Sequence, residues 1–278
     1  MKISAFTTIS NPDKRQDPWR EAILSWAAIA DEIVIVNGGE PVAYPEIDKP
    51  IRVIYKPWPD EWDWGELPKH MNAGLEACTG DWAIRFDADW IFDSSGKDKF
   101  INELSGEAKN YSVVTMQKFS SVKINTWYEK GEMQVIFNKH FPDIVIGKAM
   151  DRETDLCFPI RGVGKEKDGF GIPLGISIGE RERYKSHGRF FNFDYAFKTK
   201  EVARSEFWRF AQAYKRYFGR SEFGDTQEES FGIFLDMMRG RLAKCVYDFK
   251  PDDLPEEIRE RARNISKEQF AHSGWGML

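Results

Sequence analysis

The stretch that decides the fold is Gly80-Asp-Trp-Ala-Ile-Arg-Phe-Asp-Ala-Asp-Trp90. Residues 82–86 are mostly apolar and rich in β-forming types, which predicts a buried strand. Asp87-Ala88-Asp89 follows this strand directly. In open α/β sheets, ligands bind at the carboxyl ends of the strands. The stretch therefore predicts both a central strand and a polar site at its end.

Upstream of this strand, strand and helix signals alternate. Apolar runs predict strands over residues 2–9, 32–37 and 52–55. One helix is predicted after Asp17-Pro18, with the aspartate as N-cap and the proline at the first helical position. A second helix is predicted over residues 67–78, before Thr79-Gly80. This order is typical of an α/β fold with a mostly parallel sheet and helices on both faces.

Downstream of the central strand, further strands are expected over residues 112–116, 133–137 and 144–146. Residues 161–175 are rich in glycine, which predicts a loop. After about Lys198, apolar residues recur at helical spacing, which predicts a mainly helical C-terminal extension. We therefore expect a Rossmann-like domain over residues 1–180 and a helical extension over residues 181–278.

Composition excludes several classes of protein. The chain has 278 residues, 41% of them hydrophobic and 14% aromatic, which is too apolar for a disordered chain. It holds no apolar run long enough for a transmembrane segment and no recognisable secretory signal. Cys78, Cys157 and Cys245 are far apart, which favours a reducing compartment over a disulfide framework or a zinc site. A cytoplasmic location is therefore expected.

The net charge of −5 is unevenly distributed and argues against broad binding to nucleic-acid backbones. Residues 60–93 hold nine acidic residues against Lys69 and Arg85, which is a local net charge of −7. The other 244 residues therefore sum to +2. Five of the ten tryptophans lie in or next to the acidic stretch.

The Asp87-Ala-Asp89 pair favours a divalent cation. Two carboxylates just beyond a strand can converge on Mg²⁺ or Mn²⁺, which prefers oxygen ligands and is often shared with a diphosphate. A calcium-binding EF-hand loop is excluded because Ile91 and Phe92 occupy positions that need a ligand and a glycine. A P-loop is excluded because Gly96-Lys97 is followed by an aspartate and lacks the upstream glycine.

The order of motifs over residues 1–92 resembles the family 2 glycosyltransferases. The resemblance rests on an aromatic segment, a helix motif, a Gly-Asp-Trp turn and the DxD strand: Trp58, Trp62 and Trp64; Lys69-His-Met-Asn72-Ala-Gly-Leu75; Gly80-Asp-Trp82; Asp87-Ala-Asp89. It is fainter over residues 133–151 and 184–188. The resemblance implies a GT-A fold that binds a nucleotide-diphosphate sugar through Mn²⁺ or Mg²⁺.

The resemblance also implies roles at the cation. Asp89 is expected to ligate the metal, and Asp87 to contact the ribose or the metal. His187 matches a family histidine that closes the metal or diphosphate site, and imidazole can bind either.

Further donor-binding residues are implied by their place in the family pattern. Thr8 and Asn37 lie at the ends of the first two strands, where the family holds the nucleoside. Lys69 and Asn72 belong to the helix motif, in which Lys69 or His70 would supply positive charge toward a phosphate.

The sequence departs from the family pattern at three positions. Asn37 stands where relatives carry an acidic residue, Met71 stands where they carry arginine, and Trp90 follows the DxD pair where many carry a carboxylate.

Inverting sugar transfer needs a general base that deprotonates the acceptor hydroxyl. The resemblance favours Asp151, which follows the strand predicted over residues 144–146. Glu153 and Asp155 lie close by in the sequence, and Glu129 and Glu132 remain alternatives.

We thus expect a metal-dependent inverting glycosyltransferase. Its partners would be a nucleotide-diphosphate sugar and a glycan, lipid-linked, protein or modified-base acceptor. One alternative is a sugar-phosphate nucleotidyltransferase, although residues 10–15 lack the glycine of that class's phosphate loop. Another is a non-catalytic carbohydrate-binding protein that keeps the GT-A shell.

Overall fold

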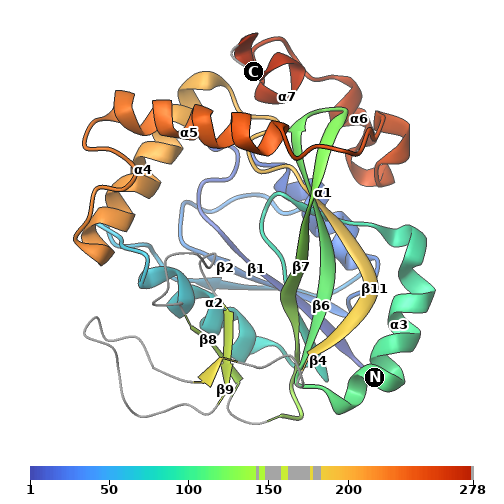
Figure 1. Ribbon diagram of the computed structural model, residues 1–278. Coiled ribbons are helices and arrows are strands. Elements are labelled where there is room, and N and C mark those ends of the chain that lie inside the picture. Colours follow the sequence, from blue (N-terminus) through green and yellow to red (C-terminus); the bar gives the residue numbers. More distant parts are fainter. Residues whose placement is uncertain (142–143, 148–157, 162–175, 178–182, 277–278) are drawn as a thin grey trace.

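The computed structural model describes residues 1–141, 144–147, 158–161, 176–177 and 183–276 (Figure 1). Its main sheet consists of β1 (Ile3–Ile9), β2 (Glu32–Asn37), β3 (Ile51–Tyr55), β4 (Trp82–Arg85), β5 (Trp90–Phe92), β6 (Val113–Lys123), β7 (Thr126–Asn138) and β11 (Arg183–Asn192). The strand order is β3-β2-β1-β4-β7-β6-β11-β5. A smaller sheet holds β8 (Ile144–Gly147), β9 (Phe158–Arg161) and β10 (Ile176–Ser177).

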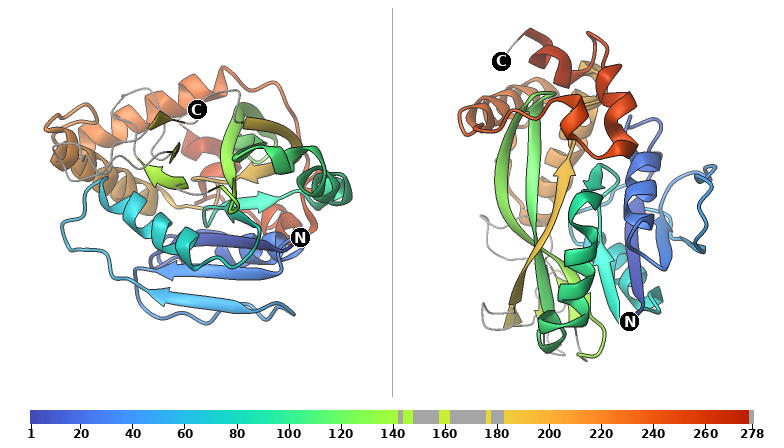
Figure 2. Two further views of the ribbon diagram at one scale, coloured as in Figure 1. Left: turned by 90° about the horizontal axis from the view of Figure 1, so that it is seen from below. Right: turned by 90° about the vertical axis from the view of Figure 1, so that its right-hand side faces the viewer.

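Helices surround the main sheet. They are α1 (Trp19–Ala27), α2 (Glu66–Ala77), α3 (Lys97–Ser105), α4 (Lys200–Phe218), α5 (Gln227–Leu242), α6 (Glu256–Arg263) and α7 (Phe270–Ser273). Short 3₁₀ helices occupy Ser94–Gly96, Glu107–Asn110, Pro251–Asp253 and Gly274–Gly276. In Figures 1 and 2, α3 lies along one side of the sheet, and α4 and α5 lie across the molecule from it.

The sheet is mixed rather than uniformly parallel. Of its seven strand pairings, β2–β3, β1–β2, β1–β4 and β6–β11 are parallel. The pairings β4–β7, β6–β7 and β5–β11 are antiparallel. Three of the parallel pairs belong to the N-terminal alternation of strands and helices, and the β6–β7 hairpin introduces two of the three antiparallel pairs. As a result, β4, β6 and β11 run in the same direction.

Side-chain alternation along β1 and β2 explains why helices cover both faces. Ile3, Ala5 and Ile9 belong to the core cluster that includes α1, whereas Phe6 belongs to the cluster that includes α2. All six residues of β2 are buried, as expected for a strand covered on both faces. The predicted α/β class with helices on both faces is confirmed.

The helix after Asp17-Pro18 forms, but its predicted N-cap is wrong. Pro18 occupies the cap position, and no side chain caps the helix. The Asp17 carboxylate instead pairs with Lys198. Because the Asp17 side chain is engaged in this buried charge pair, it does not cap the helix.

The C-terminal part is mainly helical, as predicted. The Thr199 hydroxyl caps α4, which ends at Gly219 in the left-handed conformation. A reciprocal capping box between Thr226 and Glu229 begins α5. The two helices pack on each other, and α5 also packs on β6 and β7.

The division into residues 1–180 and 181–278 stays a prediction. β11 lies within the main sheet between β6 and β5, so the helical part begins only at Lys200. Residues 162–175, which make up almost all of the glycine-rich segment, lie outside the described residues. No helix in the described part of the chain is both long and apolar enough to cross a membrane.

Candidate active site

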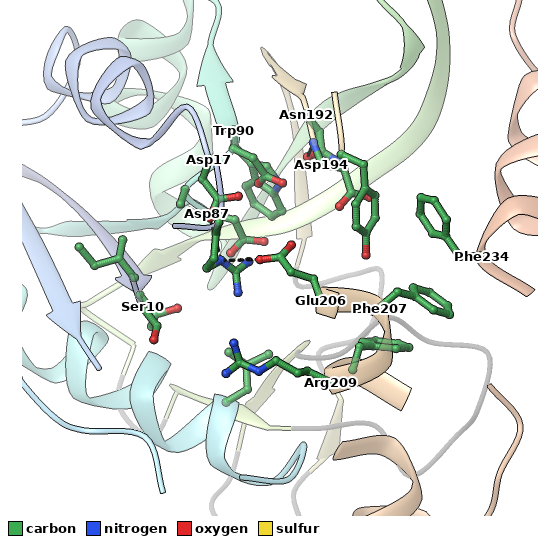
Figure 3. A pocket seen from close by; sticks show the side chains of 18 of the residues that line it. Ser10, Asp17, Asp87, Trp90, Asn192, Asp194, Glu206, Phe207, Arg209 and Phe234 are labelled. Carbon is green, nitrogen blue, oxygen red and sulfur yellow. Dashed lines mark hydrogen bonds and ion pairs between the residues drawn. The ribbon is translucent and has the colours of Figure 1, made fainter. Parts of the chain in front are cut away.

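A cavity of about 390 Å³ opens where β1 and β4 end (Figure 3). The N-terminal half of the chain lines it with Thr8, Ser10 and the Asp87-Ala-Asp89 segment. Side chains of α4 and α5 line it as well, among them Glu206, Phe207, Arg209, Phe234 and Arg241. The cavity therefore lies between the parallel part of the sheet and the C-terminal helices.

Backbone hydrogen bonds hold the DxD segment in place. The Phe86 N–H donates to the Phe6 carbonyl at 2.9 Å, which keeps the chain beside β1 just after β4 ends. The Trp90 N–H donates to the Asp87 carbonyl at 3.0 Å and closes a turn. The Phe193 N–H donates to the Asp89 carbonyl at 2.9 Å, which fixes the end of β11 next to the DxD pair.

The two carboxylates of the DxD pair have different surroundings. Both Asp87 oxygens accept from one nitrogen of the Arg85 guanidinium, at 2.8 and 2.9 Å. Burial, followed by the charges of Asp194 and Asp87, raises the pKa of Asp89 well above its ordinary value. Asp89 thus lies in an excess of negative charge that a bound cation would reduce.

Asp194 is the acidic residue that sequence reasoning missed. It comes just after β11 and lines the cavity, and it forms an ion pair with Arg241 at 3.1 Å. Because β11 and β4 run in the same direction, their carboxyl ends meet at the same edge of the sheet. The rule that singled out Asp87 and Asp89 would have found Asp194 if β11 had been predicted as a strand.

Lys118 is a buried cation in the cavity wall. It projects from β6, and its Nζ lies 4.5 Å from the centroid of the Trp90 ring. Burial and the charge of Lys130 lower the pKa of Lys118 to about 8. Asp87, Asp89 and Asp194 act in the opposite direction.

An ionic cluster, in which Asp17 and Lys198 are buried and Arg15 is partly exposed, joins the loop after β1 to α4. Arg15 Nε lies 2.8 Å from Asp17 Oδ2 and 3.1 Å from Glu206 Oε1. Lys198 Nζ lies 2.9 Å from Glu206 Oε2, pairs with Asp17 and donates to the Arg15 carbonyl at 2.8 Å. Burial disfavours the charged form of Asp17, but Arg15 and Lys198 outweigh it and lower the pKa of Asp17. These pairs tie one wall of the cavity to the other.

Three tryptophans of the aromatic segment line the cavity: Trp58, Trp62 and Trp64. Trp58 stacks on His70, with ring centroids 3.8 Å apart and planes 6° from parallel. The two ring nitrogens of His70 bond to the backbone carbonyls of Glu66 and Lys56 at 3.0 and 2.9 Å. The imidazole therefore supports Trp58.

Three of the predicted site residues reach the cavity, and their roles stay predictions. Thr8, Asp87 and Asp89 all line it. Their positions were predictable because the carboxyl ends of parallel strands lie at one edge of the sheet, and β1 and β4 are parallel neighbours.

Three other predicted donor-binding residues do not line the cavity among the described residues. The Asn37 amide binds within the turn that follows β2, donating to the Glu40 carbonyl and accepting from the Gly39 N–H. Lys69 pairs with Glu66 at 2.6 Å on the exposed face of α2. Asn72 exchanges two hydrogen bonds with the Ile146 backbone, which ties α2 to β8.

The structure does not bring His187 to the DxD pair. His187 lies five residues before Asn192, the partner of Trp90, which is roughly 17 Å along the extended strand. Its Nδ1 pairs with Glu103 on α3, and 63% of its side chain is exposed. His187 therefore faces α3 and not the DxD pair. Its role at the metal stays a prediction that this geometry does not support.

The predicted general base, Asp151, lies outside the described residues, as do Glu153 and Asp155. Of the remaining alternatives, Glu129 accepts a hydrogen bond from the Tyr247 hydroxyl at 3.1 Å.

Within the described residues, no three His, Cys, Asp or Glu side chains form a group that could hold a metal ion by themselves. Asp89 and Asp194 still fit a cation that shares its ligands with a substrate. Mg²⁺ is commonly bound by one or two carboxylates together with phosphate oxygens.

Several solved structures match the chain at low similarity. S. aureus TarS, residues 1–349, is 14% identical with a TM-score of 0.35, and the alignment covers 95% of this chain and 87% of that one. The same TarS fragment in complex with UDP is 13% identical with a TM-score of 0.37, covering 95% and 86%. Similarity at this level carries no functional argument. No curated protein sequence matches the chain.

The family comparison covers the segment that builds the site. The model of glycosyl transferase family 2 matches residues 15–166, which is more than half of the chain and includes α1, α2, β4 and the DxD pair. The match agrees with the predicted GT-A fold and with the α/β architecture described above. The chain belongs to glycosyl transferase family 2.

Proposed function

We propose that this glycosyltransferase moves a sugar from a nucleotide-diphosphate sugar to an acceptor hydroxyl, with inversion and with Mn²⁺ or Mg²⁺. The observation that supports it most is the position of Asp87 and Asp89. In a segment that matches the family, they face a cavity beside the end of β1. This is the edge of an α/β sheet at which ligands bind.

The charges around the cavity support the binding of an anionic donor together with a metal cation. Among the described lining residues, the cations are Arg15, Arg85, Lys118, Lys130, Arg209 and Arg241, and the acids are Asp17, Asp87, Asp89, Asp194 and Glu206. Six cations against five acids leave the lining at +1, although the whole chain carries −5. Asp89 and Asp194 are the carboxylates we propose for the metal. The cation would supply charge neutralisation to the diphosphate.

The protein's own groups would act as follows. Thr8 and Ser10 border the space for the nucleoside at the end of β1. The apolar side chains of α4 and α5, with Phe207 and Phe234 among them, would limit the access of water to the reacting centre (Figure 3). Asp151 stays the proposed base for the acceptor hydroxyl. The acceptor stays within the four classes named above.

The donor is tested by thermal unfolding of the full chain with a panel of nucleotide sugars, each with Mn²⁺ and with EDTA. A ligand that binds only the native state raises the melting temperature by mass action. We expect one nucleotide class to raise it, and to do so more with Mn²⁺. A panel in which no nucleotide sugar shifts the transition would contradict the proposal. Release of pyrophosphate from a nucleoside triphosphate and a sugar phosphate would support the nucleotidyltransferase alternative.

The site is tested with Asp87→Asn and Asp89→Asn. We expect each to lower sugar transfer by at least about a hundredfold, since charge stabilisation at the leaving group is commonly worth that much. Asp48→Asn is the matched control, because the Asp48 side chain is 84% exposed and is not one of the residues that line the cavity. Retention of metal-dependent donor binding and turnover in both site variants would refute the assignment.

A further inference from the structure

Lys118 differs from the other buried lysine of the site in having no partner. Only 5% of Lys118 is exposed, and it lines the cavity. In the described part of the chain, its ammonium makes no hydrogen bond or ion pair, and it lies over the face of the Trp90 ring. Lys198, by contrast, is paired with Asp17 and Glu206 and also donates to a backbone carbonyl.

The Lys118 side chain is largely buried, but its ammonium is not one of the fully buried atoms without a partner, so it opens onto the cavity. Lysine is almost never fully buried unless it is paired, and a cation–π contact offsets only part of the lost hydration. Of the three carboxylates whose charges act on Lys118, those of Asp87 and Asp194 are paired with arginine. Asp89, which we propose for the metal, forms no ion pair with Lys118 in the described part of the chain. The three N–H donors of Lys118 are therefore available to a ligand in the cavity.

The position of Lys118 narrows the choice of ligand. Its ammonium lies 4.5 Å from the centroid of the Trp90 ring, and Trp90 directly follows Asp89, so Lys118 lies on the DxD side of the cavity. This step rests on the proposed function, in which the donor places its diphosphate on the DxD side. The diphosphate oxygens can accept hydrogen bonds from an ammonium.

We propose that Lys118 binds an oxygen of the donor diphosphate and stabilises the nucleoside diphosphate as it leaves. In this step, the bond between the anomeric carbon and the phosphate oxygen breaks, and its electron pair stays on that oxygen. The acceptor oxygen forms the new bond to the anomeric carbon, and its proton passes to the general base. Negative charge grows next to Lys118 during the step, so its contribution is larger in the transition state than in the bound donor.

The test compares Lys118→Met, Lys118→Arg and the control Lys267→Met, which removes an exposed lysine that does not line the cavity. Each full-length variant is titrated calorimetrically, in the presence of Mn²⁺, with UDP, GDP and dTDP and with the corresponding nucleosides. For the diphosphate that the wild type binds, we expect Lys118→Met to weaken binding about tenfold to a hundredfold, the usual range for a hydrogen bond to a charged group. Binding of the nucleoside should be unchanged.

Two further readouts separate contact with the diphosphate from a structural role. Lys118→Arg keeps the charge and should retain more diphosphate affinity than Lys118→Met. In turnover, Lys118→Met should lower kcat more than it raises KM, because the lost interaction strengthens in the transition state. Lys267→Met should match the wild type in every measurement.

Distinct outcomes would overturn distinct proposals. If folded Lys118→Met binds the diphosphate as the wild type does, or loses nucleoside and diphosphate affinity equally, the role of Lys118 is wrong while the donor proposal stands. If the wild type binds no nucleoside diphosphate and transfers no sugar, the proposed function fails and this inference fails with it. Should Lys118→Met not fold, Lys118→Gln, with a polar head on a shorter stem, replaces it in the same comparison.

Discussion

At the scale of single residues, Gly74 shows why the helix motif contains a glycine. A Cβ at this position would lie 2.7 Å from Cδ2 of Phe6 and 3.3 Å from Cγ2 of Val36. The missing side chain therefore lets α2 approach β1 and β2. Leu67 and Met71 project from the same helix into the cavity lining. A steric requirement of packing thus sets the position of one wall of the site.

We expect Gly74→Ala to lower the free energy of unfolding by about 1–3 kcal/mol, the usual cost of overpacking a core. Gly232→Ala is the control, since a Cβ there meets nothing within 4 Å on the exposed side of α5. It should raise stability by about 0.5–1 kcal/mol through helix propensity. Urea unfolding of both variants measures the difference. A Gly74→Ala protein as stable as the wild type would show that α2 can move away.

Also at this scale, the sequence identified part of the site and missed part of it. Asp87 and Asp89 were predictable because both follow directly from a strand that its own residues reveal. Lys118 lies beyond the run that the sequence predicts as a strand, among mixed polar and apolar residues that give no sign of which way it points. Its contact with Trp90 depends on the pairing of β6 with β11 and of β11 with β5.

At the scale of elements, Glu32 joins the first two strands to the turn before β4. Its carboxylate accepts from the Ser4 hydroxyl at 2.5 Å and from the Thr79 N–H and hydroxyl at 2.7 and 2.8 Å. Burial acts to raise the pKa of Glu32, but these hydrogen bonds outweigh it and lower the pKa to about 2. The ionised form therefore stabilises the junction of β1, β2 and β4.

Because the pKa of Glu32 is lower in the folded than in the unfolded protein, its contribution is fully present above about pH 4.5. It is lost as the pH falls through about 2. We expect Glu32→Gln to lower the free energy of unfolding by about 3 kcal/mol at pH 7 and by less at pH 3. Urea unfolding at both pH values tests this, with the exposed Glu46→Gln as control. An equal loss at pH 7 and pH 3 would show that charge is not the cause.

The elements were predicted unevenly. β2 has the predicted bounds, and the ends of β1, β3, β4 and α2 differ from the predicted ones by about one residue, because local periodicity reveals these elements. β6 and β7 extend well beyond the predicted runs, since pairing within a hairpin stabilises polar positions that periodicity alone leaves out. β5 and β11 were not predicted as strands, because each is stabilised by partners distant in the sequence.

At the scale of the whole molecule, the cavity belongs to two parts of the chain. The DxD pair and the end of β1 supply one side, and α4 and α5 supply the other (Figure 3). The ionic cluster of Arg15, Asp17, Lys198 and Glu206 connects the two sides. The positive balance of the lining favours a bound anion, although the whole chain is acidic.

This balance predicts that metal and donor bind together. Mn²⁺ alone would enter a lining that already carries +1, whereas a nucleoside diphosphate brings negative charge that the cation offsets. We expect Mn²⁺ to tighten nucleoside diphosphate binding at least about tenfold, and the nucleotide to tighten Mn²⁺ binding by the same factor, as linkage requires. Calorimetric titrations in both orders measure this. Equal nucleotide affinity in EDTA and in Mn²⁺ would contradict the metal proposal.

The sequence by itself determined the alternation of strands and helices, the strand that ends at Asp87-Ala-Asp89 and the resemblance to family 2 glycosyltransferases. These depend on periodicity and on short spacings within one segment. Only the tertiary structure decided which charges meet the DxD pair. Lys118, Asp194, Glu206 and Arg209 come from other strands and helices, and they converge because strand pairing and helix packing bring distant segments together. For the same reason, the most acidic stretch of the chain faces a cavity whose lining is net positive.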